Sequence, residues 1–291
     1  MFMLKVSKFE KKLVWVTSGV IGASLILTAF LSVFYFKIKL IFRPDELMFI
    51  AMIISLFPPA VVNFLDARWK NDVDNNIPKM LKELAEAGRT GITLTRALEL
   101  ASERRYGALS KELKRIVNQL SWGATFDEAL KSFSDRVETK LAKRTAVLLT
   151  EIHKVGGEIQ EVLETVSKHI NELQTIERER QSQIKPYIAI VYIAFFVFLL
   201  IDILLIRSFF WELASLQETL QSAGGFFMGG AVNLNQVETI LFHLSLIEGF
   251  YGGLIAGKMG EGSIGAGLKH SVILMVAGFI AFFFFVWNPI F

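Results

Sequence analysis

Gly91-Ile92-Thr93-Leu94-Thr95-Arg96-Ala97-Leu98 and Gly123-Ala124-Thr125-Phe126-Asp127-Glu128-Ala129-Leu130 share one pattern, Gly-x-Thr-(large apolar)-x-x-Ala-Leu. The glycine suits the positive φ that ends a helix, and the threonine suits the N-cap of the next helix. The apolar residues that follow begin a buried helical stripe. Because Glu128 stands three residues after Thr125, the second octet also predicts a capping box. The two octets are either an internal repeat or a chance match of residues that commonly end one helix and cap the next. Both interpretations predict helices.

The octets lie in a long polar stretch, Pro78 to Ile184, of a chain that is otherwise apolar. About 40 of the 59 charged residues fall between Asp66 and Lys185. Apolar residues such as Leu109 and Leu113 recur on one side of each expected helix, so the helices must pack on one another. The last helix is long and increasingly polar, which is typical of a stalk. The pattern predicts a six-helix bundle with helices at about 78–87, 93–104, 108–121, 125–134, 138–154 and 158–184.

The composition of the 291-residue chain is that of a membrane protein. Hydrophobic residues make up 53% of it, and the mean hydropathy is +0.46. We therefore expect an all-α integral membrane protein with the helical bundle inserted between its second and third membrane spans. The net charge of +3 is too small to predict a nucleic-acid partner. The sequence contains no cysteine, which excludes disulfides, thiol catalysis and thiolate metal sites.

Five apolar segments are long enough to cross a bilayer. The first is too long for the core of a signal peptide, so it should remain as a spanning helix. Pro58-Pro59 should kink the second helix or end it early. An external segment, 208–236, is amphipathic at first, then rich in glycine, and too polar to span. The predicted spans are about 13–36, 47–64, 187–206, 237–256 and 271–287.

These segments divide the chain into three parts. Asp72 to Asn76 is a polar lead-in to the bundle, and Pro78 fits the first position of its first helix. Lys185-Pro186 should end the stalk, and Gly257 to Gly267 should form a loop of small residues. The predicted parts are an N-terminal membrane hairpin (1–65), a cytoplasmic bundle with its stalk (66–186) and a C-terminal membrane region (187–291).

The distribution of Lys and Arg predicts the orientation in the cell membrane. With five spans, the N-terminus, residues 66–186 and the loop with Lys258 and Lys269 fall on one side. That side carries most of the basic residues, so it should be cytoplasmic. Three basic residues on the opposite side argue against this orientation, although they could snorkel towards the headgroups. They are Lys37, Lys39 and Arg43.

Gly252 to Lys258 matches the first seven positions of a nucleotide-binding P-loop. The eighth position is Met259 instead of the Ser or Thr that would bind the metal ion, and no strand precedes the motif. The glycines suggest another explanation, because they recur every four residues and give a smooth face for close helix packing. We therefore expect no cofactor. The expected helix-packing glycines are Gly249, Gly253 and Gly257.

Two acidic residues fall inside the predicted spans. Glu248 lies near the middle of the fourth span, where a charge costs at least about 2.5 kcal/mol, and Asp202 lies near the outer end of the third. Such residues either bond neighbouring helices in protonated form or take part in a proton or ion relay. The second interpretation predicts an ion-coupled transporter or channel. However, no inverted repeat among the five spans favours it.

Other chemistry has little support in the sequence. The four histidines, at positions 153, 169, 243 and 270, show no i,i+3 or i,i+4 pairing, so no metal site is expected. No Ser/His/Asp group stands at a recognisable nucleophile turn, so we expect no catalytic residue and no enzyme activity.

Charges segregate within the polar stretch. Acidic residues dominate its last two helices, and basic residues cluster in its middle helices. Each group is either a solvated face or a docking surface for a cytoplasmic partner. The acidic residues are Glu151, Glu158, Glu161, Glu164, Glu172 and Glu177. The candidate contact residues are Arg104, Arg105, Lys111, Lys114, Arg115, Lys140, Lys143 and Arg144.

Further motifs accompany the octets along residues 47–287. They are Ile77 to Leu81, Trp122 before the second octet, Gly156 to Leu163, Lys185 to Tyr192, Gly253 to Gly262 and Gly267 to His270. Together with the membrane layout, they resemble the type II secretion system F domain family. The last three motifs are similar to its archaeal branch, the membrane platform proteins of archaella and type IV pilus-like machines.

This resemblance implies a non-enzymatic membrane platform. Such a protein works with a cytoplasmic hexameric secretion ATPase and helps to move pilin-like subunits from the membrane into a filament. Archaeal members commonly carry two modules in one chain, whereas this chain has one. The resemblance therefore implies a homodimer, or a heteromer with a second single-module platform protein. It transfers no catalytic residue.

Overall fold

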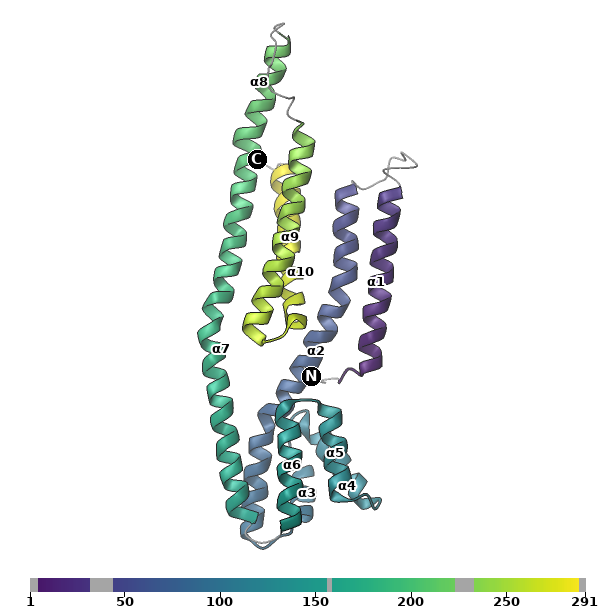
Figure 1. The fold of residues 1–291 in the computed structure, drawn as a ribbon, viewed down its shortest axis with the longest axis vertical. Helices are drawn as coiled ribbons and strands as arrows, with labels where there is room; N and C mark the ends of the chain where they lie inside the picture. The colour runs from purple at the N-terminus through teal and green to yellow at the C-terminus, as the bar shows by residue number, and fades with distance from the viewer. Residues whose placement is uncertain (1–4, 32–43, 156–158, 223–232, 288–291) are drawn as a thin grey trace. The chain divides into compact units, whose positions relative to one another are not determined.

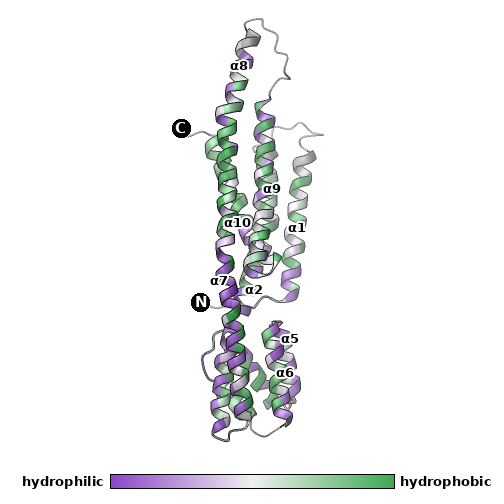
Figure 2. Cartoon of the chain, turned by 60° about the vertical axis from the view of Figure 1, so that its left-hand side comes forward, coloured by the Kyte–Doolittle hydropathy of each residue, from purple (hydrophilic) through white to green (hydrophobic). Residues whose placement is uncertain are grey.

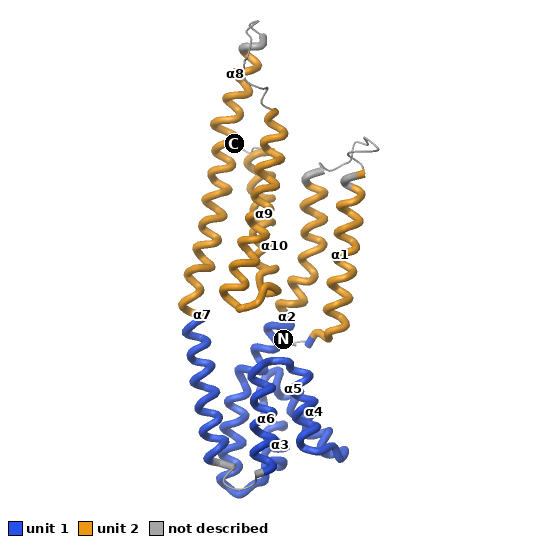
Figure 3. The backbone as a smooth tube through the Cα atoms, viewed as in Figure 1, with its two compact units in different colours: residues 1–5, 65–180 blue, residues 6–64, 181–291 orange. Residues whose placement is uncertain are grey.

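The computed structural model describes residues 5–31, 44–155, 159–222 and 233–287. Every regular element in these ranges is a helix, as the sequence predicts. Tertiary contacts divide the chain into two compact units (Figure 3). Unit 1 holds residues 1–5 and 65–180, and unit 2 holds residues 6–64 and 181–291.

Unit 2 consists mainly of long apolar helices (Figures 1 and 2). Its complete helices are α1 (Lys8–Leu31), η2 (Leu205–Phe210), α8 (Trp211–Ser222), α9 (Leu234–Glu261), α10 (Ile264–Phe282) and η3 (Phe283–Trp287). It also holds the first part of α2 (Pro44–Arg89) and the last part of α7 (Ile159–Leu204). Phe195, Phe242 and Met275 are buried in its core.

Five helices of the described chain are long and apolar enough to cross a membrane, which confirms the predicted number of spans. The first two segments lie in α1 and α2, and the third runs from α7 through η2 into α8. The last two lie in α9 and in α10 with η3. Large apolar side chains such as Phe196, Leu200 and Ile247 remain more than half exposed. Water would penalise such surfaces, whereas lipid does not. The chain is therefore a multi-pass membrane protein.

Unit 1 is a bundle of helices around one apolar core. Its complete helices are α3 (Leu94–Ser102), α4 (Leu109–Ser121), α5 (Phe126–Val137) and α6 (Lys140–Val155). Parts of α2 and α7 complete it, and Figure 2 shows α7 changing from largely hydrophilic to largely hydrophobic along its length. Leu81, Leu98, Leu113 and Phe133 are almost completely buried in the core. The packing is the one that the one-sided apolar stripes predict.

The two octets perform the roles that their sequences predict. Thr93 caps α3 and accepts a hydrogen bond from the Arg96 amide at 3.4 Å. Thr125 caps α5 in the same way, and Glu128 completes the capping box by accepting from the Thr125 amide at 3.0 Å. Gly91 and Gly123 precede these caps with φ of +75° and +90°. These values are unfavourable for residues with a Cβ atom, which explains the glycines.

α2 runs unbroken through Pro58-Pro59 and through Pro78, so it does not end early at the first pair of prolines. The first bundle helix therefore does not begin at Pro78. A proline within a helix leaves the carbonyl four residues earlier without its usual donor. For Pro78 this carbonyl belongs to Asp74, and the Gln174 side chain donates to it at 2.7 Å. A distant residue thus replaces the lost hydrogen bond and lets the helix continue.

Two further boundaries were predicted wrongly. α7 continues through Pro186, so Lys185-Pro186 does not end the stalk. The expected loop of small residues from Gly257 to Gly267 is mostly helix, because α9 ends at Glu261 and α10 begins at Ile264. Only a tight turn joins them, in which Gly262 has a φ of +72° and Ser263 caps α10.

Some expectations fall outside the described residues. These are the basic residues Lys37, Lys39 and Arg43, the Gly156-Gly157 break with Glu158, and the glycine-rich part of the 208–236 segment. The described parts of that segment are the end of η2, α8, and residues 233–236 at the start of α9.

Candidate functional site

The eight candidate contact residues lie on three elements of unit 1, and all of their side chains are exposed. We call them the basic surface. Arg104 and Arg105 lie between α3 and α4, three residues lie on α4, and three lie on α6. α5 packs against both α4 and α6. The α4 residues are Lys111, Lys114 and Arg115, and the α6 residues are Lys140, Lys143 and Arg144.

Two residues of the basic surface form ion pairs within unit 1. Arg104 Nε lies 3.1 Å from Glu83 Oε2 on α2. Arg115 lies 2.6 Å from Glu112, whose buried carboxylate is also 2.8 Å from Arg136 Nε on α5. Arginines can hold such a carboxylate with several charge-assisted hydrogen bonds. Arg115 therefore has a structural role that the sequence pattern did not reveal.

Five other members of the basic surface carry a positive charge that no acidic residue of the described chain neutralises. Among the described residues, Arg105, Lys114, Lys140, Lys143 and Arg144 form no ion pair. Their ammonium and guanidinium groups are therefore available to an acidic surface outside the chain. Exposed ion pairs contribute little individually, about 0–1 kcal/mol, but several together can steer and orient a partner.

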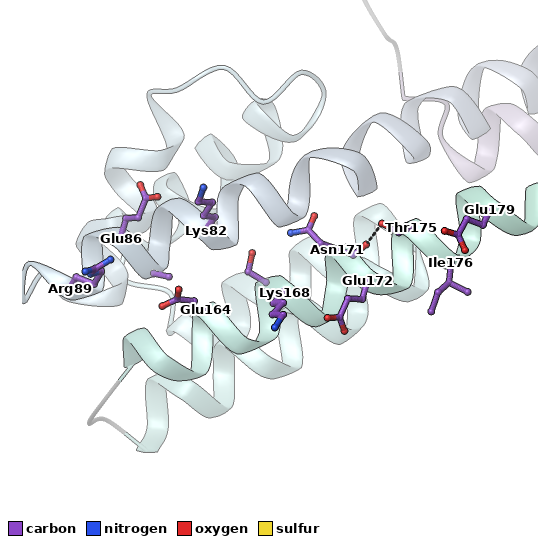
Figure 4. Close-up of a pocket in the computed structure, with 12 residues that line it drawn as sticks. Lys82, Glu86, Arg89, Glu164, Lys168, Asn171, Glu172, Thr175, Ile176 and Glu179 are labelled. Atoms are coloured by element: carbon purple, nitrogen blue, oxygen red, sulfur yellow. Dashed lines mark hydrogen bonds between the residues drawn. The ribbon is translucent and has the colours of Figure 1, made fainter. Parts of the chain in front are cut away.

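The acidic residues of the last two bundle helices have different surroundings. Glu151 lies 3.6 Å from Lys154, and Glu177 lies 2.6 Å from Arg180, so both are neutralised locally. Glu164 and Glu172 instead line a groove between α2 and α7 (Figure 4). The groove has a volume of about 850 Å³. It brings together two helix faces that are far apart in the sequence.

The polar segment of α2 that was expected to lead into the bundle is a connection point for three helices. Asp72 Oδ2 accepts from the Ala108 amide at 2.6 Å, at the start of α4. Asp74 Oδ1 accepts from the hydroxyl of Thr139, before α6, at 2.6 Å. Asn75 accepts from Arg178 on α7 at 3.5 Å. The sequence does contain a signal for this helix, because Val73 continues the apolar spacing upstream of Pro78.

The intramembrane acids lie on two helices of unit 2, Asp202 on α7 and Glu248 on α9. Asp202 is 3% exposed. Among the described residues, Asp202 Oδ2 and Glu248 Oε2 are buried without a hydrogen-bond partner. Buried carboxylates without partners are unfavourable, so both residues are candidates for a functional role.

The three expected packing glycines all lie on the side of α9 that meets α10. A Cβ atom at Gly253 would overlap the backbone of Ser271, and one at Gly257 would overlap the backbone of Gly267. At Gly249 it would lie 3.2 Å from the Met275 amide nitrogen. The backbones of α9 and α10 therefore approach closely. The P-loop-like segment lies inside α9, where its amides serve the helix rather than a phosphate.

Two of the four histidines contact aromatic side chains. His153 stacks on Phe126 in unit 1, and His270 Nδ1 lies 2.7 Å from the Tyr192 hydroxyl in unit 2. Over the described ranges, no group of three or more His, Asp or Glu residues could hold a metal ion.

The chain is 26% identical over 255 residues to the uncharacterized protein MJ1286 of Methanocaldococcus jannaschii. The alignment covers 87% of this chain but 41% of the relative, so the chain spans about two fifths of the length of the relative. No solved structure matches the chain.

The family comparison matches residues 80–206 to the model described as type II secretion system (T2SS), protein F. The matched region begins in unit 1 and ends in η2, after the apolar part of α7. The resemblance seen in the helical turns and the membrane layout is therefore confirmed. Residues 80–206 form a domain of the type II secretion system protein F family.

Proposed function

We propose that the chain is a non-enzymatic membrane platform of an archaellum-like, type IV pilus-like or type II secretion-like assembly machine. The match of residues 80–206 to the protein F family carries this proposal. The match joins a polar helical bundle to an apolar helix that is long enough to span. Such a chain can transmit movement between a soluble motor and the membrane without making or breaking bonds.

In this proposal, unit 1 lies in the cytoplasm and binds a hexameric secretion ATPase. Its basic surface supplies the contact, because five of its eight cations form no ion pair within the described chain. Grooves between the spans receive the apolar helices of pilin-like subunits. The movement passes from unit 1 through α2 and α7, since both helices continue into unit 2.

We further propose that two modules act together. The relative MJ1286 is more than twice as long as the segment that it shares with this chain. A hexameric motor presents several equivalent surfaces, and a single bundle can occupy only part of them. A second copy of the chain, or another single-module platform protein, would complete the assembly.

Pull-down of a secretion ATPase from the same genome by the full chain in detergent tests the proposed contact. Reversing Lys143 and Arg144 to Glu should weaken binding about tenfold, because attraction of an acidic surface becomes repulsion. The control reverses Lys79 and Lys131, which are exposed on α2 and α5 outside the basic surface. Equal effects of the two double variants would refute the surface assignment. Failure of the unaltered chain to bind would refute the platform proposal.

One other function is favoured by Asp202 and Glu248, whose carboxylates each have an oxygen without a hydrogen-bond partner among the described residues. That function is an ion-coupled transporter or channel. Buried acids inside a membrane are common in proton and ion pathways. This candidate predicts ion flux in proteoliposomes that hold the chain alone, abolished by Glu248→Gln. The platform proposal predicts no ion flux from the unaltered chain or from the Glu248→Gln variant.

A further inference from the structure

The groove between α2 and α7 follows one face of each helix (Figure 4). α2 contributes four residues from Lys82 to Arg89, spaced i, i+3, i+4 and i+7. α7 contributes eight residues from Glu164 to Glu179, spaced alternately by three and by one. This spacing keeps each set in one row along its helix. At 1.5 Å per residue, the α7 row is about 22 Å long, which is the length of four helical turns.

The charged groups of the groove lack partners inside the chain. Within the described ranges, Lys82, Arg89, Glu164, Lys168 and Glu179 form no ion pair. Glu172 has His169 at 3.9 Å, and that contact is charged only when the histidine is protonated. Many other charges of unit 1 are paired within the chain. A partner could therefore pair the groove charges without first breaking existing contacts.

The two rows carry opposite net charge, because basic residues outnumber Glu86 on α2 and acidic residues outnumber Lys168 on α7. Lys82 and Arg89 lie seven residues apart on α2, and Glu172 and Glu179 lie seven residues apart on α7. Seven residues are about two helical turns, so each pair projects from one edge of the groove. This is the arrangement by which the flanking positions of coiled coils select partners.

The surface between the two charged edges is made of small residues. Ala85 is buried, and the buried Ser167 donates to the Pro78 carbonyl at 3.2 Å, so neither projects far into the groove. Ile176 is 61% exposed and offers one apolar anchor. Small side chains allow helix backbones to approach closely. The groove therefore has room for a third helix rather than for an extended strand.

We propose that this groove binds one amphipathic helix of a partner protein. The helix carries acidic residues seven apart on the edge that faces α2, and basic residues seven apart on the edge that faces α7. The charge complementarity of the two edges identifies it. Because the contact surface is small and polar, the complex is transient and sensitive to salt. This site shares no residue with the basic surface, so it is independent of the proposed ATPase contact.

Three synthetic peptides of three heptads test this pairing against the full chain in nanodiscs. All have the same Ala/Leu contact face. The first has Glu on one edge and Lys on the other, the second has Glu on both edges, and the third has Lys on both. Fluorescence anisotropy should show that the mixed peptide binds at least about fivefold more tightly than the others, and more weakly in high salt. Equal binding by all three, or binding by none, overturns the proposal.

A charge-swapped variant tests whether the groove is the binding site. Glu172→Lys with Glu179→Lys gives both edges a net positive charge, so the preference should change to the peptide with Glu on both edges. The control, Glu103→Lys with Asp135→Lys, changes two exposed acids outside the groove and should keep the original preference. If the control behaves like the swap, bulk charge explains the binding and the proposal fails. Self-association of the chain that the swap abolishes would assign the groove to a second copy, and would also overturn it.

Discussion

Asp74 is a half-buried residue whose carboxyl group connects α2 to other helices of unit 1. The Thr139 hydroxyl donates to its side chain, and Gln174 donates to its backbone carbonyl. Burial raises the pKa of Asp74 from 3.8 to about 6, although the Thr139 hydroxyl and the nearby Lys70 both act to lower it. The desolvation of the carboxylate therefore outweighs its hydrogen bond and its favourable charge interaction.

This pKa predicts how the stability of the bundle depends on pH. Because folding raises the pKa, the folded state favours protonated Asp74, and the stability from this group is complete below about pH 4. It is lost as the pH rises through about 6, and the shift corresponds to roughly 3 kcal/mol. Asp74→Asn keeps an acceptor for Thr139 but cannot ionise. The variant should therefore unfold at a higher temperature than the unaltered chain above pH 7, and the difference should shrink below pH 4.

Thermal unfolding of the full chain in detergent, followed by circular dichroism between pH 4 and pH 8, measures this difference. The control is Asp135→Asn, because Asp135 is an exposed acid on α5. It should follow the unaltered chain at every pH. A difference between Asp74→Asn and the unaltered chain that does not vary with pH would contradict the prediction.

The contact of α9 with α10 depends on glycines whose surroundings differ sharply. A Cβ atom at Gly257 would overlap the Gly267 backbone, whereas one at Gly252 would lie 3.5 Å from the nearest atom, Val191 Cγ1. Backbone cannot rotate away as a side chain can, so the first substitution must separate the helices. We expect Gly257→Ala to destabilise the chain by about 1–3 kcal/mol and Gly252→Ala to change it by less than about 0.5 kcal/mol. Unfolding temperatures in detergent will compare them, and equal losses would show that the contact is looser than described.

The elements that the sequence predicts correctly are those with local causes. The caps of α3 and α5 depend on residues within one turn, so Thr93 and Thr125 suffice to predict them. The proline boundaries fail because their outcome is decided elsewhere. Gln174, which supplies the carbonyl partner at Pro78, is 100 residues from Asp74 in the sequence. The residues near Pro78 in the sequence therefore cannot predict this donor.

The candidate site shows the same division. Exposure of the basic residues follows from helical periodicity and could be predicted. The pairing of Arg104 with Glu83, and of the buried Glu112 with Arg136 on α5, depends on tertiary packing and could not. The groove also needs the pairing of α2 with α7, two helices that the sequence separates by four others.

At the scale of the whole molecule, the number of spans determines which connections share a side of the membrane. With five spans, unit 1 and the turn between α9 and α10 fall on one side, and α8 falls on the other. The bias of Lys and Arg predicts that the side of unit 1 is cytoplasmic. A cytoplasmic ATPase can reach unit 1 only in this orientation, so the proposed function depends on it.

Single cysteines can test the orientation directly, because the natural sequence has none. Three exposed residues would each be changed to Cys. They are Ser121 in unit 1, Lys258 near the end of α9 and Ser215 on α8. In intact cells a membrane-impermeant maleimide should label Ser215→Cys, and it should label the other two only after permeabilisation. Ser121→Cys and Lys258→Cys act as controls for each other, since an even number of crossings separates them. Labelling of Ser121→Cys in intact cells would place unit 1 outside, where no cytoplasmic motor could bind it.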